Sequence, residues 1–237
     1  MKHGMGFIVF LFALCPQWVF AAQDKIGPWE KINEKHGIVT YARTNPRVVL
    51  KECKAVGLVD ATVPELESMM RDYDAYKKIL FLSKKVTPID FPGYKNTADT
   101  LYVYLLQGAP WPVDDRDGAG RLDFYVQRSS NTVMMKCQTV IPEYPKTKGV
   151  VRLPFCEMEW IFKPVSATTS QVTYQAMIEP GGSISALPTS VIDWCMKYLG
   201  TFTVQNMRKV AKQGKYKHAK TIITQTELPE NLVHYLE

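Results

Sequence analysis

Histidine-based catalytic and metal-binding motifs are missing from this sequence. Its four histidines are scattered, and none belongs to an HExxH motif. There is no GxSxG or GxxxxGK pattern, and the cysteines show neither CxxC nor Cys/His spacing suited to zinc. Cys53 and Cys195 lack an inferable base, so we interpret them as buried thiols. We therefore expect no catalytic residue, no metal and no cofactor.

Long apolar runs are also absent, except at the beginning of the chain. There, the basic Lys2 precedes a uniformly apolar stretch, residues 7–15, and Ala21 supplies a small residue at cleavage spacing. This pattern is typical of a secretory signal peptide. We expect residues 1–21 to be removed and the protein to be periplasmic or secreted. The alternative is an uncleaved anchor, but Pro16 interrupts the apolar stretch, and a span needs about 20 apolar residues.

The composition indicates one globular domain without repeats or low-complexity tracts. Hydrophobic residues make up 46% of the chain and charged residues 22%, which excludes disordered and fibrous classes. The net charge of +6 is compatible with nucleic acid or an anionic membrane, and export disfavours nucleic acid. We expect a monomer that binds no nucleic acid.

The residue pattern predicts an α+β fold. Residues 29–34 suggest a short helix, two strands follow, and an amphipathic helix is expected over 64–80. The next segments read as consecutive strands of an antiparallel sheet: 82–90, 98–107, 119–127, 132–141, 151–163 and 170–179. A long helix is expected over 184–212. We assign residues 22–213 to the domain and 214–237 to a loosely packed tail.

Two of the predicted strands alternate clearly between two faces. Apolar and sulfur-bearing side chains share one face: Met135, Cys137, Cys156, Met158, Trp160 and Phe162. Polar side chains share the other: Lys136, Gln138, Glu157 and Glu159. The first set can form an ordinary filled core or the wall of a ligand cavity under the terminal helix. The pattern alone leaves both possibilities open.

Several segments resemble the START family of lipid-transfer domains in their order and in their sequence motifs. The most specific match is the motif Pro110-Trp111-Pro112-Val113-Asp114-Asp115-Arg116-Asp117. An early Trp29 followed by the strand 37–43, and the turn 179–182 before the last helix, also match. The resemblance covers about residues 29–213. The chain departs from the family at Ser183–Pro188, where Ile-Pro-x-Trp is usual.

The resemblance implies a helix-grip fold, in which a curved antiparallel sheet wraps around a long C-terminal helix and encloses an internal hydrophobic cavity. It also implies a lipid-binding or lipid-transfer protein that encloses one sterol, phospholipid or fatty-acid-like ligand. We expect the following residues to line the cavity: Met135, Met158, Trp160, Phe162, Trp194, Tyr198 and Phe202. The alternatives are a helix-grip enzyme of cyclase or hydrolase type and an interaction module with a filled core.

Two arginines are candidate contacts for a lipid head group. Arg116 lies among Asp114, Asp115 and Asp117, so it can brace its loop or reach the head group. Arg152 can enter the cavity or face solvent. A basic run is a candidate contact with an anionic membrane surface, although it also suits a helix C-terminus: Arg208, Lys209, Lys212, Lys215, Lys217 and Lys220.

A disulfide between Cys137 and Cys156 is geometrically possible. If residues 141 and 152 face each other across antiparallel strands, Cys137 also faces Cys156. Directly opposed residues lie within the distance that a disulfide spans, and export provides an oxidising environment. Two unpaired thiols are the alternative, because the register is not fixed by the connection.

Overall fold

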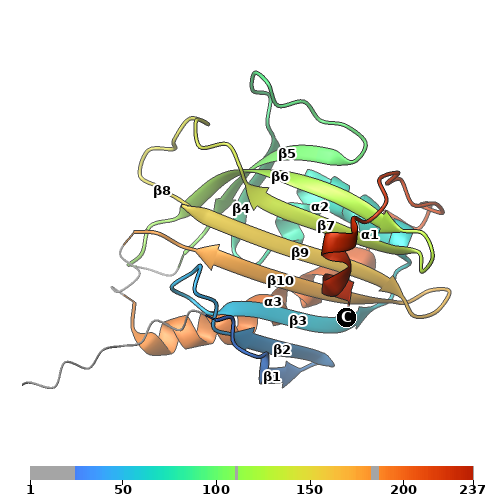
Figure 1. The fold of residues 1–237 in the computed structure, drawn as a ribbon, viewed down its shortest axis with the longest axis horizontal. Helices are drawn as coiled ribbons and strands as arrows, with labels where there is room; N and C mark the ends of the chain where they lie inside the picture. Colours follow the sequence, from blue (N-terminus) through green and yellow to red (C-terminus); the bar gives the residue numbers. More distant parts are fainter. Residues whose placement is uncertain (1–24, 110–111, 183–186, 237) are drawn as a thin grey trace, which may run out of the picture.

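The computed structural model describes residues 25–109, 112–182 and 187–236. The predicted signal peptide, Pro110, Trp111 and residues 183–186 lie outside these ranges. The described chain forms a ten-stranded sheet in the order β1-β2-β3-β10-β9-β7-β6-β5-β4, with β8 beside β6 (Figure 1). The strands are β1 Glu30–Lys35, β2 Ile38–Arg43, β3 Glu52–Val59, β4 Ser83–Pro88, β5 Thr100–Gln107, β6 Arg116–Gln127, β7 Thr132–Thr139, β8 Val151–Arg152, β9 Phe155–Pro164 and β10 Ser170–Glu179.

The first element is a strand, so the helix predicted over residues 29–34 is wrong. Lys35 pairs directly with Ile38, which leaves His36 and Gly37 as a two-residue turn with φ of 56° and 66°. Positive φ at both central residues fits the twist of a β-hairpin. Pairing with β2 therefore overrides the weak local helical preference of this segment.

The predicted helix over residues 64–80 is present as two helices, α1 Val63–Arg71 and α2 Tyr73–Ile79. Asp72 separates them in an extended conformation, with φ −88° and ψ 110°. Its carboxylate accepts hydrogen bonds from the backbone N–H groups of Asp74 and Ala75 and so caps α2. The sequence pattern gave no sign of this break because apolar spacing continues across it.

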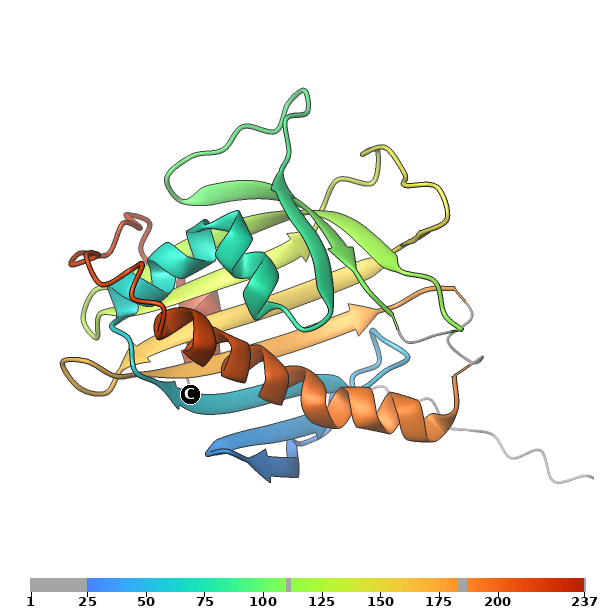
Figure 2. The same cartoon turned by 180° about the vertical axis from the view of Figure 1, so that it is seen from behind.

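The predicted long terminal helix is present as α3 Thr189–Ala211, and it lies across one face of the sheet (Figure 2). Helices α1 and α2 lie on the same face. The C-terminal half of α3 packs directly on the sheet, since Thr201, Val204 and Met207 are fully buried. This arrangement confirms the predicted α+β helix-grip fold.

The side chains that we expected on the inner face of the two central strands are all buried, which confirms that assignment. The register between these strands differs from the prediction. Cys137 pairs with Met158, and Cys156 pairs with Ile178 on the other side. The pairing is offset by two residues from the one that would set the two cysteines face to face. The predicted disulfide is absent, and Cys137 and Cys156 are both free.

The cause of the offset lies in the strand predicted over 151–163. Residues 151–152 leave it and form β8, which pairs in parallel with Arg116 and Asp117 of β6. Strand β9 therefore begins only at Phe155. Two residues after β7 are thus used in the pairing with β6, and β9 is displaced along the chain. The alternation of apolar and polar residues cannot reveal this extra pairing.

The tail beyond residue 213 packs closely on the domain, in contrast to the loose extension that we predicted. Glu67 on α1 is fully buried, and its carboxylate accepts hydrogen bonds from the backbone N–H groups of Ile223 and Thr224, at 2.7 and 2.9 Å. The N–H of Leu228 donates to the carbonyl of Val126 on β6. A buried carboxylate and a strand-like pairing thus fix the tail.

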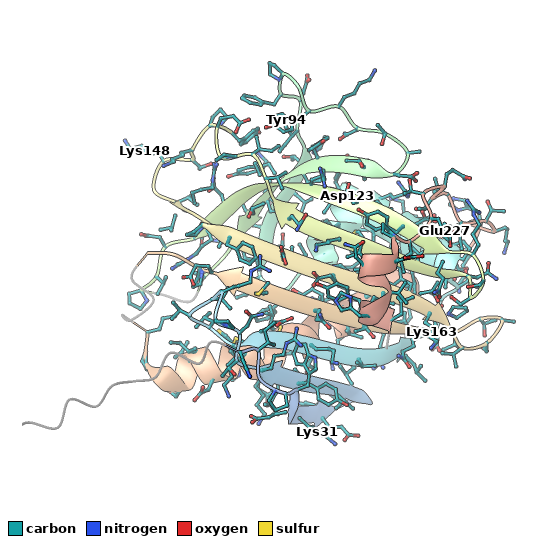
Figure 3. All side chains as sticks on the ribbon, viewed as in Figure 1. Lys31, Tyr94, Asp123, Lys148, Lys163 and Glu227 are labelled. Atoms are coloured by element: carbon teal, nitrogen blue, oxygen red, sulfur yellow. The ribbon has the colours of Figure 1, made fainter. Side chains whose placement is uncertain are left out.

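The tail ends in the 3-10 helix η2 Glu230–Leu236, which crosses the outer face of the sheet (Figure 1). Its Leu232, Val233 and Tyr235 pack near Met134 and Ile161 of the sheet. Figure 3 shows the side chains of this face, with Asp123 on β6 and Glu227 in the tail labelled. The outer face of the sheet is therefore partly covered, and Glu159 there is only 3% exposed.

Candidate ligand-binding cavity

An apolar cavity of about 200 Å³ lies between the N-terminal half of α3 and the sheet. The sheet contributes Cys53, Leu105, Arg116, Cys156, Met158, Tyr174, Ala176 and Ile178, and α3 contributes Ile192, Cys195, Met196 and Leu199. Gln107 at the end of β5 also lines the cavity, and the connections contribute Leu50, Lys51, Leu80, Phe81, Leu82, Gly108, Ala109, Val113, Leu153, Pro180 and Leu187. Nearly all of these side chains are apolar.

One stripe of α3 forms the roof of this cavity. Ile192, Cys195, Met196 and Leu199 follow one another at spacings of three, one and three residues, which places them on one helix face. One residue further on, Gly200 lies so close to β3 that an added Cβ would come within 2.5 Å of the Cβ of Ala55. The helix thus touches the sheet at Gly200 and leaves space under the preceding two turns.

The cavity has a buried inner end. Cys53, Met158, Tyr174 and Ala176 are all 5% exposed or less. The Tyr174 hydroxyl has only the Met158 sulfur as a hydrogen-bond acceptor in the described structure, at 3.6 Å. Burial raises the pKa of the Cys53 thiol to about 12 and that of Cys156 well above its ordinary value. Both cysteines are therefore neutral, unreactive wall residues near pH 7.

The opposite part of the lining, which we call the outer end, is partly exposed. It includes Lys51 and Leu82, which are exposed, and Gln107 and Val113, which are half-buried. Arg116, at the start of β6, also lines the cavity, although only 6% of its surface is exposed. The charged side chains and the amide of the lining therefore belong to the outer end, and the Tyr174 hydroxyl lies at the inner end.

Arg116 braces the chain between β10 and α3. Its Nε donates to the carbonyl of Pro180 at 3.3 Å and its Nη2 to the carbonyl of Gly181 at 3.2 Å, while Nη1 donates to the carbonyl of Asp114. Burial lowers the pKa of this guanidinium, and the charges of Asp114 and Asp115 act in the opposite direction. The bracing role considered from sequence is thus present, through backbone carbonyls, and the same side chain also lines the cavity.

Arg152 is placed outside the cavity lining. Its Nε lies 2.7 Å from Oδ1 of the buried Asp117, and its Nη atoms donate to the carbonyls of Tyr144 and Pro145. The ion pair ties β8 to β6 and holds the connection that precedes β8. Arg152 thus stabilises the pairing of β8 with β6 and does not line the cavity.

Of the other predicted wall residues, only Met158 lines the cavity. Met135, Trp160 and Phe162 are fully buried in the solid core next to it. Trp194, Tyr198 and Phe202 lie on another face of α3, where they pack together and against Phe81. Sequence reasoning chose the aromatic stripe of α3, whereas the cavity faces the aliphatic and sulfur-bearing stripe.

The described residues form neither a cluster of metal ligands nor a membrane-spanning helix. No group of three or more His, Cys, Asp or Glu side chains in residues 25–109, 112–182 and 187–236 is placed to hold a metal ion. None of the helices formed by these residues is long and apolar enough to cross a membrane.

Comparisons with known proteins agree with this architecture. No family model matches the sequence. An uncharacterised protein of Pseudomonas aeruginosa is 26% identical over 157 residues, which cover 66% of this chain and 74% of that protein. The phosphatidylcholine transfer protein of Rattus norvegicus is 24% identical over 173 residues, covering 71% of this chain and 77% of the relative.

Solved structures give the clearest comparison. A STAR-related lipid transfer protein from Xanthomonas axonopodis superposes with a TM-score of 0.67 at 26% identity, covering 78% of this chain and 99% of that one. Human StAR-related lipid transfer protein 5 superposes with a TM-score of 0.66 at 17% identity, covering 78% and 86%. The chain therefore has the START fold. The resemblance to the START family that the sequence motifs indicated is confirmed.

Proposed function

We propose that this protein is a non-catalytic lipid-binding protein that holds one hydrophobic ligand between α3 and the sheet. The observation that carries the proposal is the apolar cavity of about 200 Å³ at this place. A filled core, the alternative, would leave no such space under the N-terminal half of α3. The names of the similar proteins, which refer to lipid transfer, support the same function.

The size of the cavity favours a ligand with a single hydrocarbon chain. About seven groups of the size of a water molecule, at about 30 Å³ each, fit in this volume. Seven methylenes at about 0.8 kcal/mol each contribute about 6 kcal/mol, which alone corresponds to a dissociation constant near 0.1 mM. Polar contacts at the outer end of the cavity are therefore needed for micromolar affinity.

The chemistry of the lining supports binding rather than catalysis. The lining residues in the described part of the chain include no histidine and no carboxylate. The two innermost cysteines are held as neutral thiols by burial. The described lining thus offers neither a histidine nor a carboxylate as the general base that a helix-grip enzyme of the cyclase or hydrolase type would use to activate a nucleophile.

The proposal extends to where the protein acts. We propose export to the periplasm or outside the cell after loss of residues 1–21, and action as a monomer. We also propose transient contact with anionic membranes through the basic run near the end of α3. Arg208 in this run donates to the carbonyls of Leu58 and His36, and Lys217 pairs with Glu65, so Lys209, Lys212 and Lys220 are the better candidates for the contact.

Displacement of a fluorescent probe tests the binding function. The full chain is titrated with the probe, and sterol, fatty acid and lysophospholipid competitors are added in turn. Micromolar displacement by at least one class is expected. Failure of all classes, with a protein that unfolds cooperatively, would remove the binding function and leave the filled-core interpretation.

A further inference from the structure

The charges that line the cavity are all of one sign. Lys51 and Arg116 are the ionisable side chains of positive charge in the lining, and no Asp or Glu of the described chain lines it. The neighbouring segments 110–111 and 183–186, whose sequences are Pro-Trp and Ser-Ile-Ser-Ala, contain no ionisable residue either. The charged side chains of the described lining are therefore both cations.

Arg116 is a buried cation without a contacting carboxylate. Asp115, its neighbour, has its carboxylate oxygens 2.7 and 2.9 Å from Nζ of Lys84. Asp117 is paired with Arg152, and Asp114 is exposed. Within the described residues, Arg116 forms hydrogen bonds to three backbone carbonyls and no salt bridge. Its charge is thus partly screened but not neutralised by contact.

The guanidinium also keeps donors for a ligand. It has five N–H groups, and the three carbonyls account for one each on Nε, Nη1 and Nη2. One N–H on each Nη atom remains for a charge-assisted hydrogen bond to an anion. The other cation, Lys51, is exposed, and its Nζ forms a long ion pair with Oε2 of Glu30 at 3.9 Å.

From this arrangement we infer that the ligand is a single-chain amphiphile with an anionic head group, a carboxylate or a phosphate, held by Arg116 and Lys51. This inference rests on the proposed function and adds its ligand class. The chain of the ligand occupies the space beneath Ile192 and Leu199, and its head group stays at the outer end. A cationic head group finds no carboxylate or histidine in the described lining.

Ligands that share one chain and differ in head-group charge test the inference. Dodecanoic acid, dodecyl phosphate, dodecanol and dodecylamine are compared at pH 8 by displacement of an uncharged fluorescent probe, with inorganic phosphate as a control for the head group alone. At least one of the two anions is expected to bind about tenfold more tightly than the alcohol, because charge-assisted hydrogen bonds exceed neutral ones by about this factor. The amine is expected to bind least tightly.

Variants connect the preference to the two cations. Lys51→Glu is expected to remove most of the tenfold preference for the anions over dodecanol. The matched control is Lys54→Glu, three residues further along the chain, on β3 and on the opposite face of the sheet, and it is expected to keep the preference. Arg116→Gln is expected to act like Lys51→Glu, but it also removes the brace on Pro180 and Gly181. Lys51→Glu therefore decides the test if Arg116→Gln does not fold.

The outcomes separate the inference from the proposed function. Equal affinity for acid, phosphate, alcohol and amine overturns the anionic head group and leaves a lipid-binding protein. A preference that survives both Lys51→Glu and Arg116→Gln overturns the assignment to these residues. Failure of all four amphiphiles and of the sterol and lysophospholipid competitors overturns the proposed function itself. Binding of inorganic phosphate as tight as that of dodecyl phosphate overturns the amphiphile class.

Discussion

Filling the cavity from the sheet side distinguishes a ligand site from an incidental packing gap. Ala176 on β10 is 3% exposed and lines the cavity, and its cross-strand partners Met158 and Cys53 line it as well. In Ala176→Phe, the added phenyl group enters existing space. The usual cost of overpacking, about 1–3 kcal/mol, is therefore avoided, and the melting temperature is expected to stay equal or to rise.

The same substitution is expected to weaken ligand binding strongly. A phenyl ring excludes about four methylenes of the ligand, and at about 0.8 kcal/mol each this loss amounts to about 3 kcal/mol, or roughly 100-fold in affinity. The assay is isothermal titration or probe displacement, together with thermal unfolding. Thr173→Phe, on the opposite face of the same strand, is the matched control and is expected to bind normally. Normal binding by a folded Ala176→Phe protein would refute the assignment of the cavity.

Three further predictions concern stability and access. Burial raises the pKa of Glu159 from 4.5 to about 7 in the folded protein, so the folded state binds this proton more tightly than the unfolded chain does. The free energy of unfolding therefore falls as the pH rises from about 4.5 to 7. Glu159→Gln is expected to remove this decline, which is roughly 3 kcal/mol at most. Urea unfolding at pH 5 and pH 8 measures it, and a variant that loses as much stability between the two pH values as the natural protein contradicts the prediction. Gly200→Val is expected to lower the melting temperature by several degrees because its Cβ would meet Ala55 at 2.5 Å, and a stable variant would show that α3 does not touch β3 there. A bound ligand is expected to slow maleimide labelling of the half-buried Cys195, and labelling at an equal rate with and without ligand excludes α3 as the roof.

Much of the fold could be predicted because strand alternation and helical spacing are local properties. The inward set from Met135 to Phe162 and the terminal helix are both present where the pattern placed them. The errors occurred where long-range pairing decides. Residues 29–34 became a strand because a two-residue turn pairs them with β2, and β8 shifted the register by pairing with β6.

The wall of the cavity was harder to predict than its location between sheet and helix. Trp194 and Leu199 both belong to apolar stripes of α3, and only the position of the contact at Gly200 decides which stripe faces the cavity. Aromatic size therefore misled the choice of wall residues. Trp160, which we expected in the wall, is fully buried, so replacing it with arginine would test folding rather than binding.

The role of the tail could not be inferred from composition. Its sequence is polar enough to suggest an extension, but Glu67 on α1 has no charge partner in the tail and binds its backbone instead. Backbone N–H groups carry no sequence signal, so a contact of this kind is invisible until the fold is known.

Native mass spectrometry of the protein purified from its own host, without detergent, shows directly whether the cavity holds a lipid. We expect a species heavier than the polypeptide by the mass of one lipid, which is released intact on activation and identified in negative-ion mode as a single-chain anionic amphiphile. Ala176→Phe purified in the same way is expected to carry much less of it. A protein that is always free of ligand, and that takes up none when lipids from the host are added, would contradict the claim that this cavity is a lipid-binding site.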